Sequence, residues 1–113
     1  MGKITVETCE IEGLKIITPA IFGDHRGYFM ETYNYNDYKA AGIDQIFVQD
    51  NQSSSGKNVL RGLHFQIHYP QDKLVRVLVG EVFDVAVDLR PGSATYGKWY
   101  GVRLSAENKK QFF

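Results

Sequence analysis

The most regular pattern in the sequence is Val82-Phe83-Asp84-Val85-Ala86-Val87-Asp88-Leu89-Arg90, which alternates residue by residue. In an extended chain, successive side chains point to opposite faces. One face then carries Phe83, Val85, Val87 and Leu89, and the other carries Asp84, Ala86 and Asp88. The alternation predicts a β-strand with its apolar side in the core. Asp84 lies either on a solvated outer face or on a face shared with functional side chains.

Turn residues divide the rest of the chain into further short strands. Gly13 separates residues 5–10 from 14–18, and Gly23 and Gly27 bracket a charged turn within residues 22–31. Further strands are expected at residues 47–51, 59–66, 74–79 and 98–104, with one or two helical turns at residues 38–41 after an N-cap at Asn36. Many short strands with frequent turns predict an all-β antiparallel sandwich or barrel.

The composition is that of one globular domain, residues 1–113. Hydrophobic residues make up 43% and charged residues 23% of the chain, and 13 basic residues balance 13 acidic ones. No excess of positive charge is available to attract nucleic acid or an anionic membrane. The lone Cys9 excludes an internal disulfide, and no apolar run is long enough for a signal peptide or a membrane span. We therefore expect a soluble, cytoplasmic protein.

The C-terminus ends on Gln111-Phe112-Phe113, where another strand begins. The two phenylalanines look exposed, because few residues remain to cover them. We therefore expect a sandwich that is truncated at its C-terminal end.

Residues 59–66 hold three polar side chains among apolar ones: Arg61, His64 and Gln66. Arginine can bind phosphate or carboxylate with two parallel hydrogen bonds, and histidine can transfer a proton near neutral pH. The alternative is a half-buried strand with a hydrogen-bonded core histidine. Arg61 and His64 are three positions apart, so a regular strand would point them to opposite faces. A bulge at Gly62 would bring them to one side.

A metal site is not expected in this segment. His64 and His68 share a strand face but lie about 13 Å apart at roughly 3.3 Å per residue, too far to bind one ion. Gln66 stands between them and is a poor zinc or iron ligand. The sequence also lacks a nucleophile elbow and a glycine-rich phosphate loop.

Proton transfer at carbon is the chemistry that remains. A neutral imidazole can remove a hydrogen next to a ketone if a cation stabilises the enolate oxygen. His64 would be this base and Lys73 the cation, although a lysine at a strand end is also a common surface charge. A hairpin of residues 47–51 with 59–66 would place Gln49 and Asn51 beside them.

Several motifs in order resemble the dTDP-4-dehydrorhamnose 3,5-epimerase family. They are Phe22-Gly-Asp-His-Arg-Gly-Tyr-Phe-Met-Glu31, Phe47-Val-Gln-Asp-Asn-Gln-Ser53, Leu60-Arg-Gly-Leu-His-Phe-Gln66, Gln71-Asp-Lys-Leu-Val-Arg-Val77, Gly80-Glu-Val-Phe-Asp-Val-Ala-Val-Asp-Leu-Arg90 and Leu104-Ser-Ala-Glu-Asn108. The resemblance implies a cupin-type jelly roll that works as a homodimer without metal or organic cofactor. It also implies the substrate dTDP-4-dehydro-6-deoxy-D-glucose, inverted at C3 and C5 for dTDP-L-rhamnose biosynthesis.

The resemblance assigns roles to nine residues. By similarity His64 is the catalytic base and Lys73 steadies the enolate, while Arg61 holds diphosphate or sugar. The remaining positions bind substrate: Phe22, Arg26, Glu31, Gln49, Asn51 and Asp84. Of these, Phe22, Arg26 and Glu31 match positions that reach the partner subunit's site.

Two features of the family have no counterpart in the sequence. Members continue beyond Phe113 and supply there a tyrosine that reprotonates the carbanion and an aspartate that pairs with the histidine. The 113-residue polypeptide is therefore expected to bind weakly and to epimerise poorly, because catalytic groups that act as a unit are not additive. Two alternatives stay open: a relative that inverts one carbon or isomerises the ketone, and a non-catalytic nucleotide-sugar binding module.

Overall fold

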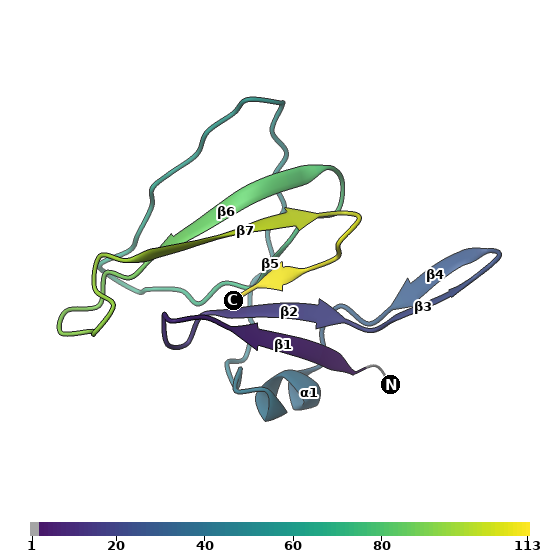
Figure 1. Ribbon diagram of the computed structural model, residues 1–113, viewed down its shortest axis with the longest axis horizontal. Helices are drawn as coiled ribbons and strands as arrows, with labels where there is room; N and C mark the ends of the chain where they lie inside the picture. The colour runs from purple at the N-terminus through teal and green to yellow at the C-terminus, as the bar shows by residue number, and fades with distance from the viewer. Residues whose placement is uncertain (1–2) are drawn as a thin grey trace.

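The computed structural model describes residues 3–113 and is built almost entirely of antiparallel strands (Figure 1). In chain order the elements are β1 (Ile4–Thr8), β2 (Lys15–Pro19), β3 (Ile21–Asp24), β4 (Gly27–Met30), α1 (Tyr35–Ala40), β5 (Val75–Arg76), β6 (Glu81–Val87), β7 (Trp99–Ser105) and β8 (Gln111–Phe112). The all-β antiparallel class predicted from the sequence is confirmed. None of the helices in this described part is long and apolar enough to cross a membrane.

One four-stranded sheet joins the two ends of the chain. Its strand order is β1-β2-β8-β5, and β2 meets β8 with Ile16 opposite Phe112 and Ile17 opposite Gln111. Gly13 makes the turn between β1 and β2 with a φ of 91°, a conformation that favours glycine. The predicted N-terminal hairpin is therefore present, and the C-terminal residues hold it in place.

The core is divided between the two faces of this sheet. Ile16 packs with Leu104 and Phe112, whereas Ile17, the next residue, packs with Tyr38 and Ile43. Successive residues of a strand point to opposite faces, so β2 is covered on both sides. The exposure expected for the C-terminal phenylalanines is wrong: Phe112 is buried, and Phe113 packs against the second cluster.

The second sheet is the hairpin of β6 and β7, and its buried side differs from the prediction. Ala86, together with Tyr100 and Val102 of β7, packs against the first core cluster, whereas Phe83 is 58% exposed. The side that contains Asp84 and Ala86 is therefore the core side. Alternation shows which side chains share a face of the strand. Which of the two faces is buried depends on the layer that packs against it.

The hairpin of β3 and β4 projects away from the body of the molecule (Figure 1). We call residues 21–30 the arm. The radius of gyration is 15.1 Å, larger than the roughly 13 Å expected for a compact domain of this length. The arm and the excursion described next account for this extended shape.

Residues 44–74 form a long irregular excursion between α1 and β5 (Figure 1). The strands predicted at 47–51 and 59–66 are absent from it, and the strand predicted at 74–79 is reduced to β5. Val48 and Leu60 are more than 90% exposed. No strand among residues 3–113 pairs with the excursion, and an unpaired strand leaves its backbone hydrogen bonds unmade. The prediction was wrong because an apolar pattern identifies a segment that can form a strand, but the strand also needs a neighbouring strand to pair with.

The short helix begins at Tyr35, three residues before the predicted residues 38–41. Asn34 is its N-cap, in place of Asn36, and its side-chain oxygen accepts a hydrogen bond from the backbone nitrogen of Asp37 at 3.2 Å. Gly42 follows the helix with a φ of 95°, a conformation that suits glycine after a helix end.

Candidate functional site

The arm brings two predicted nucleotide-binding residues to one concavity. Phe22 on β3 and Arg26 at the turn both line it, together with Asp24, Gly27, Tyr28 and Phe29. The Phe22 ring is half exposed and lies opposite Phe29 in the ladder. An aromatic face beside a guanidinium can stack on a base and pair with a phosphate.

Arg26 is bound by a carboxylate within the same turn. Its guanidinium donates to both carboxylate oxygens of Asp24, the shortest contact being 2.6 Å, and its backbone nitrogen donates to Asp24 Oδ1. These bonds lower the pKa of Asp24 and raise that of Arg26. A phosphate that binds Arg26 has to compete with Asp24 or share the guanidinium with it.

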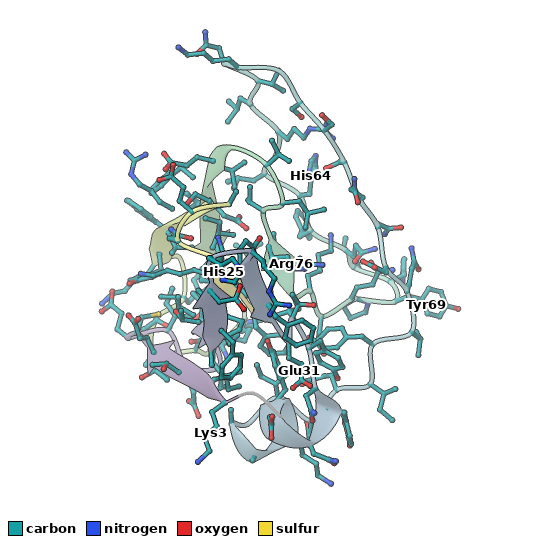
Figure 2. The ribbon with its side chains drawn as sticks, turned by 90° about the vertical axis from the view of Figure 1, so that its right-hand side faces the viewer. Lys3, His25, Glu31, His64, Tyr69 and Arg76 are labelled. Carbon is teal, nitrogen blue, oxygen red and sulfur yellow. The ribbon has the colours of Figure 1, made fainter. Side chains whose placement is uncertain are left out.

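Glu31 lies where the arm returns to the body. It is half-buried directly after β4, and Figure 2 shows it between the arm and α1. Glu31 and Arg76 of β5 both act electrostatically on the hydroxyl of Tyr38, with opposite signs. Burial dominates and raises the pKa of Tyr38 to about 12.

Five predicted residues lie on the excursion and are exposed: Gln49, Asn51, Arg61, His64 and Lys73. Gln49 Nε2 donates to Asn51 Oδ1 at 3.4 Å, so these two side chains lie on the same side of the chain. Arg61 Nε donates to Ser55 Oγ at 2.9 Å, within the excursion itself. The bulge hypothesis for Gly62 is untested, because no ladder passes through that residue.

Lys73 and Asp84 lie at different depths. Lys73 is exposed, two residues before β5. Asp84 is half-buried on the core side of β6, where burial raises the pKa of its carboxyl. Of the two positions considered for Asp84, the solvated outer face is excluded.

The predicted site is not assembled within the described residues. No hydrogen bond or ion pair among residues 3–113 joins His64 to Arg61, Lys73 or Asp84. Figure 2 shows His64 on the excursion, away from Glu31 and Arg76. In the same part of the chain, no three histidine, cysteine, aspartate or glutamate side chains gather closely enough to hold a metal ion.

Sequence reasoning missed a buried carboxylate at the end of β6. The Asp88 side chain is fully buried and accepts hydrogen bonds from Arg90, Ser93 and Thr95, the two hydroxyl contacts being 2.6 Å each. The bonds from Arg90, followed by those from the two hydroxyls, hold the pKa of Asp88 well below its usual range. The signal was the spacing of Asp88 and Arg90, two residues apart before a Pro-Gly turn.

Comparison with known proteins connects these residues to a family. The family model described as dTDP-4-dehydrorhamnose 3,5-epimerase matches residues 8–113. The chain belongs to this family. A curated 3,5-epimerase from Methanothermobacter thermautotrophicus is 58% identical over 113 residues, which cover all of this chain and 61% of the relative. The chain thus spans about three-fifths of the length of that relative.

Two solved epimerase structures show the same fold. A dTDP-6-deoxy-D-glucose-3,5-epimerase from Legionella pneumophila, in complex with dTDP-4-keto-L-rhamnose, has a TM-score of 0.92 and 55% identity, covering 96% of this chain and 58% of that one. A double mutant of a 3′-monoepimerase from Streptomyces bikiniensis, in complex with dTDP, has a TM-score of 0.84 and 34% identity, covering 93% and 54%. The predicted cupin-type fold is confirmed by this likeness.

Proposed function

We propose that this chain contributes substrate binding and proton abstraction to a dTDP-4-dehydrorhamnose 3,5-epimerase. The reaction inverts C3 and C5 of dTDP-4-dehydro-6-deoxy-D-glucose. The observation that carries this proposal is the likeness to the Legionella pneumophila epimerase in complex with dTDP-4-keto-L-rhamnose. The motifs at residues 22–31, 60–66 and 71–77 lie within the matched range and contain most of the proposed site residues.

In the proposed mechanism, His64 acts as the base. A neutral imidazole takes the proton from C3 or C5, and the electron pair of the broken C–H bond moves into the C4 ketone to form an enolate. Lys73 stabilises the negative charge on the enolate oxygen. An acid then protonates the carbon on the opposite face. The electron pair of the enolate forms the new C–H bond, the C4 ketone is restored, and the configuration at that carbon is inverted. No redox step is involved.

Substrate binding is proposed for the other predicted residues. Arg61 binds the diphosphate or the sugar, and Gln49 and Asn51 line the pocket. For this assembly the excursion has to fold against the sheet face that carries Asp84. The exposed apolar side chains of the excursion, such as Leu60 and Phe65, supply a reason for it to do so.

The nucleotide is proposed to bind the arm, in a homodimer. Phe22 stacks on thymine, Arg26 pairs with diphosphate, and Glu31 completes the site, reaching into the active site of a second copy. The projection of the arm away from its own sheets supports this arrangement (Figure 1). The cytoplasmic location and the absence of a cofactor remain predictions from the sequence.

A second candidate is inversion at one carbon only. The likeness to the Streptomyces bikiniensis 3′-monoepimerase favours keeping it, because the fold is shared between the two activities. The two reactions use the same base and the same enolate chemistry at C4. They differ in how many carbons exchange hydrogen.

The test is hydrogen exchange in heavy water. The product of the complete coding sequence is incubated with dTDP-4-dehydro-6-deoxy-D-glucose in D2O, and deuterium is located by NMR. Incorporation at both C3 and C5 with formation of the L-rhamno product supports the proposal. Incorporation at one carbon indicates the single-carbon epimerase, and binding without exchange indicates a nucleotide-sugar binding module.

A further inference from the structure

The arm returns to the body at a carbonyl that is held by a buried side chain. The carbonyl of Thr32, two residues after β4, accepts a hydrogen bond from Gln111 Nε2 at 2.8 Å. Gln111 belongs to β8 and is fully buried, so the donor end of this bond is shielded from water, and the acceptor residue Thr32 is half-buried. It joins two residues that are 79 positions apart.

The hydroxyl of Tyr38 binds the other end of the same Gln111 amide. The hydroxyl lies 2.6 Å from Gln111 Oε1 and 3.0 Å from the Thr32 carbonyl. A hydroxyl has one hydrogen, so the shorter contact to Gln111 takes it. The amide of Gln111 then becomes the donor for Thr32. Tyr38 is itself 1% exposed, and the three groups form a hydrogen-bonded cluster at the edge of the second core cluster.

The arm has two further attachments to the body. At its entry, the backbone nitrogen of Ala20 donates to the carbonyl of Lys3 at 2.8 Å, continuing the ladder of β1 and β2. Along its side, Lys109 Nζ stands 4.4 Å from the centroid of the Tyr28 ring. Lys109 and Gln111 both follow the turn after β7, where Asn108 accepts hydrogen bonds from the backbone nitrogens of Ser105 and Lys110. One C-terminal segment therefore contacts both the arm, at Tyr28, and the segment that follows it, at Thr32.

We propose that Gln111 is a positioning residue for nucleotide binding: by holding the Thr32 carbonyl it fixes Glu31 and the direction in which the arm presents Phe22 and Arg26. This inference rests on the proposed function of the arm in binding the dTDP moiety. Gln111 touches neither nucleotide nor sugar. It acts through the backbone at the point where the arm leaves the sheet, because an attachment at both entry and exit restricts the swing of the hairpin. Lys109 supports the same orientation from the solvent side.

The test compares two variants in the product of the complete coding sequence. Gln111→Met keeps the length of the side chain but removes the donor to Thr32 and the acceptor for Tyr38. Tyr38→Phe removes only the hydroxyl and leaves the bond from Gln111 to Thr32. Both variants lose buried hydrogen bonds, so their stability changes are of the same kind. They differ in whether the arm keeps its attachment.

Three quantities are measured for each variant: the Kd for dTDP by calorimetry, kcat and KM for epimerisation, and amide hydrogen exchange in peptides covering residues 20–34. We expect Gln111→Met to weaken dTDP binding about ten-fold and to speed exchange in the arm, since one buried hydrogen bond to a backbone acceptor is lost. We expect kcat at saturating substrate to stay within about two-fold, because the reacting groups are untouched. Tyr38→Phe should remain within about three-fold of the wild type in Kd.

Equal weakening by both variants would overturn the proposal, since general loss of core stability would then explain the effect. Wild-type affinity in Gln111→Met would overturn it too. If Gln111→Met does not fold, Lys109→Met serves instead. A smaller rise in Kd of about two-fold is expected from the loss of a half-buried cation over an exposed aromatic ring, and an unchanged Kd counts against the proposal. If the wild type does not bind dTDP, the proposed function of the arm fails, and hydrogen exchange alone decides whether Gln111 anchors the arm.

Discussion

Asp84 lies directly opposite Val102 in the ladder of β6 and β7, on the face that packs against Ile16, Leu104 and Phe112. A carboxylate in this position loses part of its hydration, and burial accordingly raises its pKa. A half-buried carboxylate on an apolar face is costly to the fold, and such a cost is expected where a residue serves function.

Asp84→Asn should therefore stabilise the protein and impair its activity. The raised pKa means that the carboxyl favours the folded state only while it is protonated, and this contribution is lost as pH rises through the folded pKa. At pH 7 the neutral amide of the variant avoids the free-energy cost of partly burying an ionised carboxylate. We therefore expect the melting temperature to rise by about 1–3 °C. The gain should disappear below pH 3.8, the ordinary aspartate value. Thermal melts at both pH values, with epimerase assays, check this; a lower melting temperature at pH 7 would contradict it.

Asp88 should behave in the opposite way. Its carboxylate accepts bonds from Arg90, Ser93 and Thr95, which lower its pKa and favour the folded state above the ordinary aspartate value. This contribution is lost as pH falls through that value toward the folded pKa. We expect Asp88→Asn to lower the melting temperature at pH 7 by about 5 °C or more.

Melting temperatures at low pH supply the control for the Asp88→Asn variant. The difference in melting temperature between the wild type and Asp88→Asn should shrink as pH falls below 3.8. A difference that stays constant down to low pH would show that packing, and not the charge of Asp88, is responsible. Ser93→Ala removes one donor and should have a smaller effect in the same direction.

We expect Asp24 to compete with phosphate for Arg26. The ion pair between them is exposed, with Arg26 79% and Asp24 45% accessible, and such pairs contribute little to stability. Asp24→Asn keeps an oxygen that can accept from the backbone nitrogen of Arg26 but removes the charge. We expect dTDP to bind about two- to five-fold more tightly at low salt, with the gain reduced at high salt. Arg26→Gln should weaken binding; unchanged Kd values in both variants would mean that Arg26 does not meet the nucleotide.

Local patterns predicted the elements that are stabilised by their own neighbours in sequence. The β1–β2 hairpin and the arm each consist of two short strands around a turn glycine, so pattern and partner lie within a few residues. The same holds for β6 and β7, whose alternation and intervening turn are both visible in the sequence. Antiparallel hairpins of this kind can be predicted from the local sequence alone.

Contacts between distant residues escaped prediction. The burial of Phe112 depends on pairing with Ile16 in β2 and with Val75 in β5, and the role of Gln111 depends on Thr32 and Tyr38. The core side of β6 depends on which layer covers it. Residues 59–66 carry an apolar pattern typical of a strand but have no paired neighbour within the described part. The candidate site was therefore found by motif, while its assembly could not be derived from the pattern.

We propose that His64 removes the proton from carbon. The most direct measurement is the rate of deuterium incorporation from D2O into dTDP-4-dehydro-6-deoxy-D-glucose by the product of the complete coding sequence and by its His64→Asn variant. We predict that the wild type incorporates deuterium at C3 and C5, and that His64→Asn lowers both rates by about 10²- to 10⁴-fold while the Kd for dTDP changes by less than about three-fold. Exchange at an undiminished rate in His64→Asn would contradict the account.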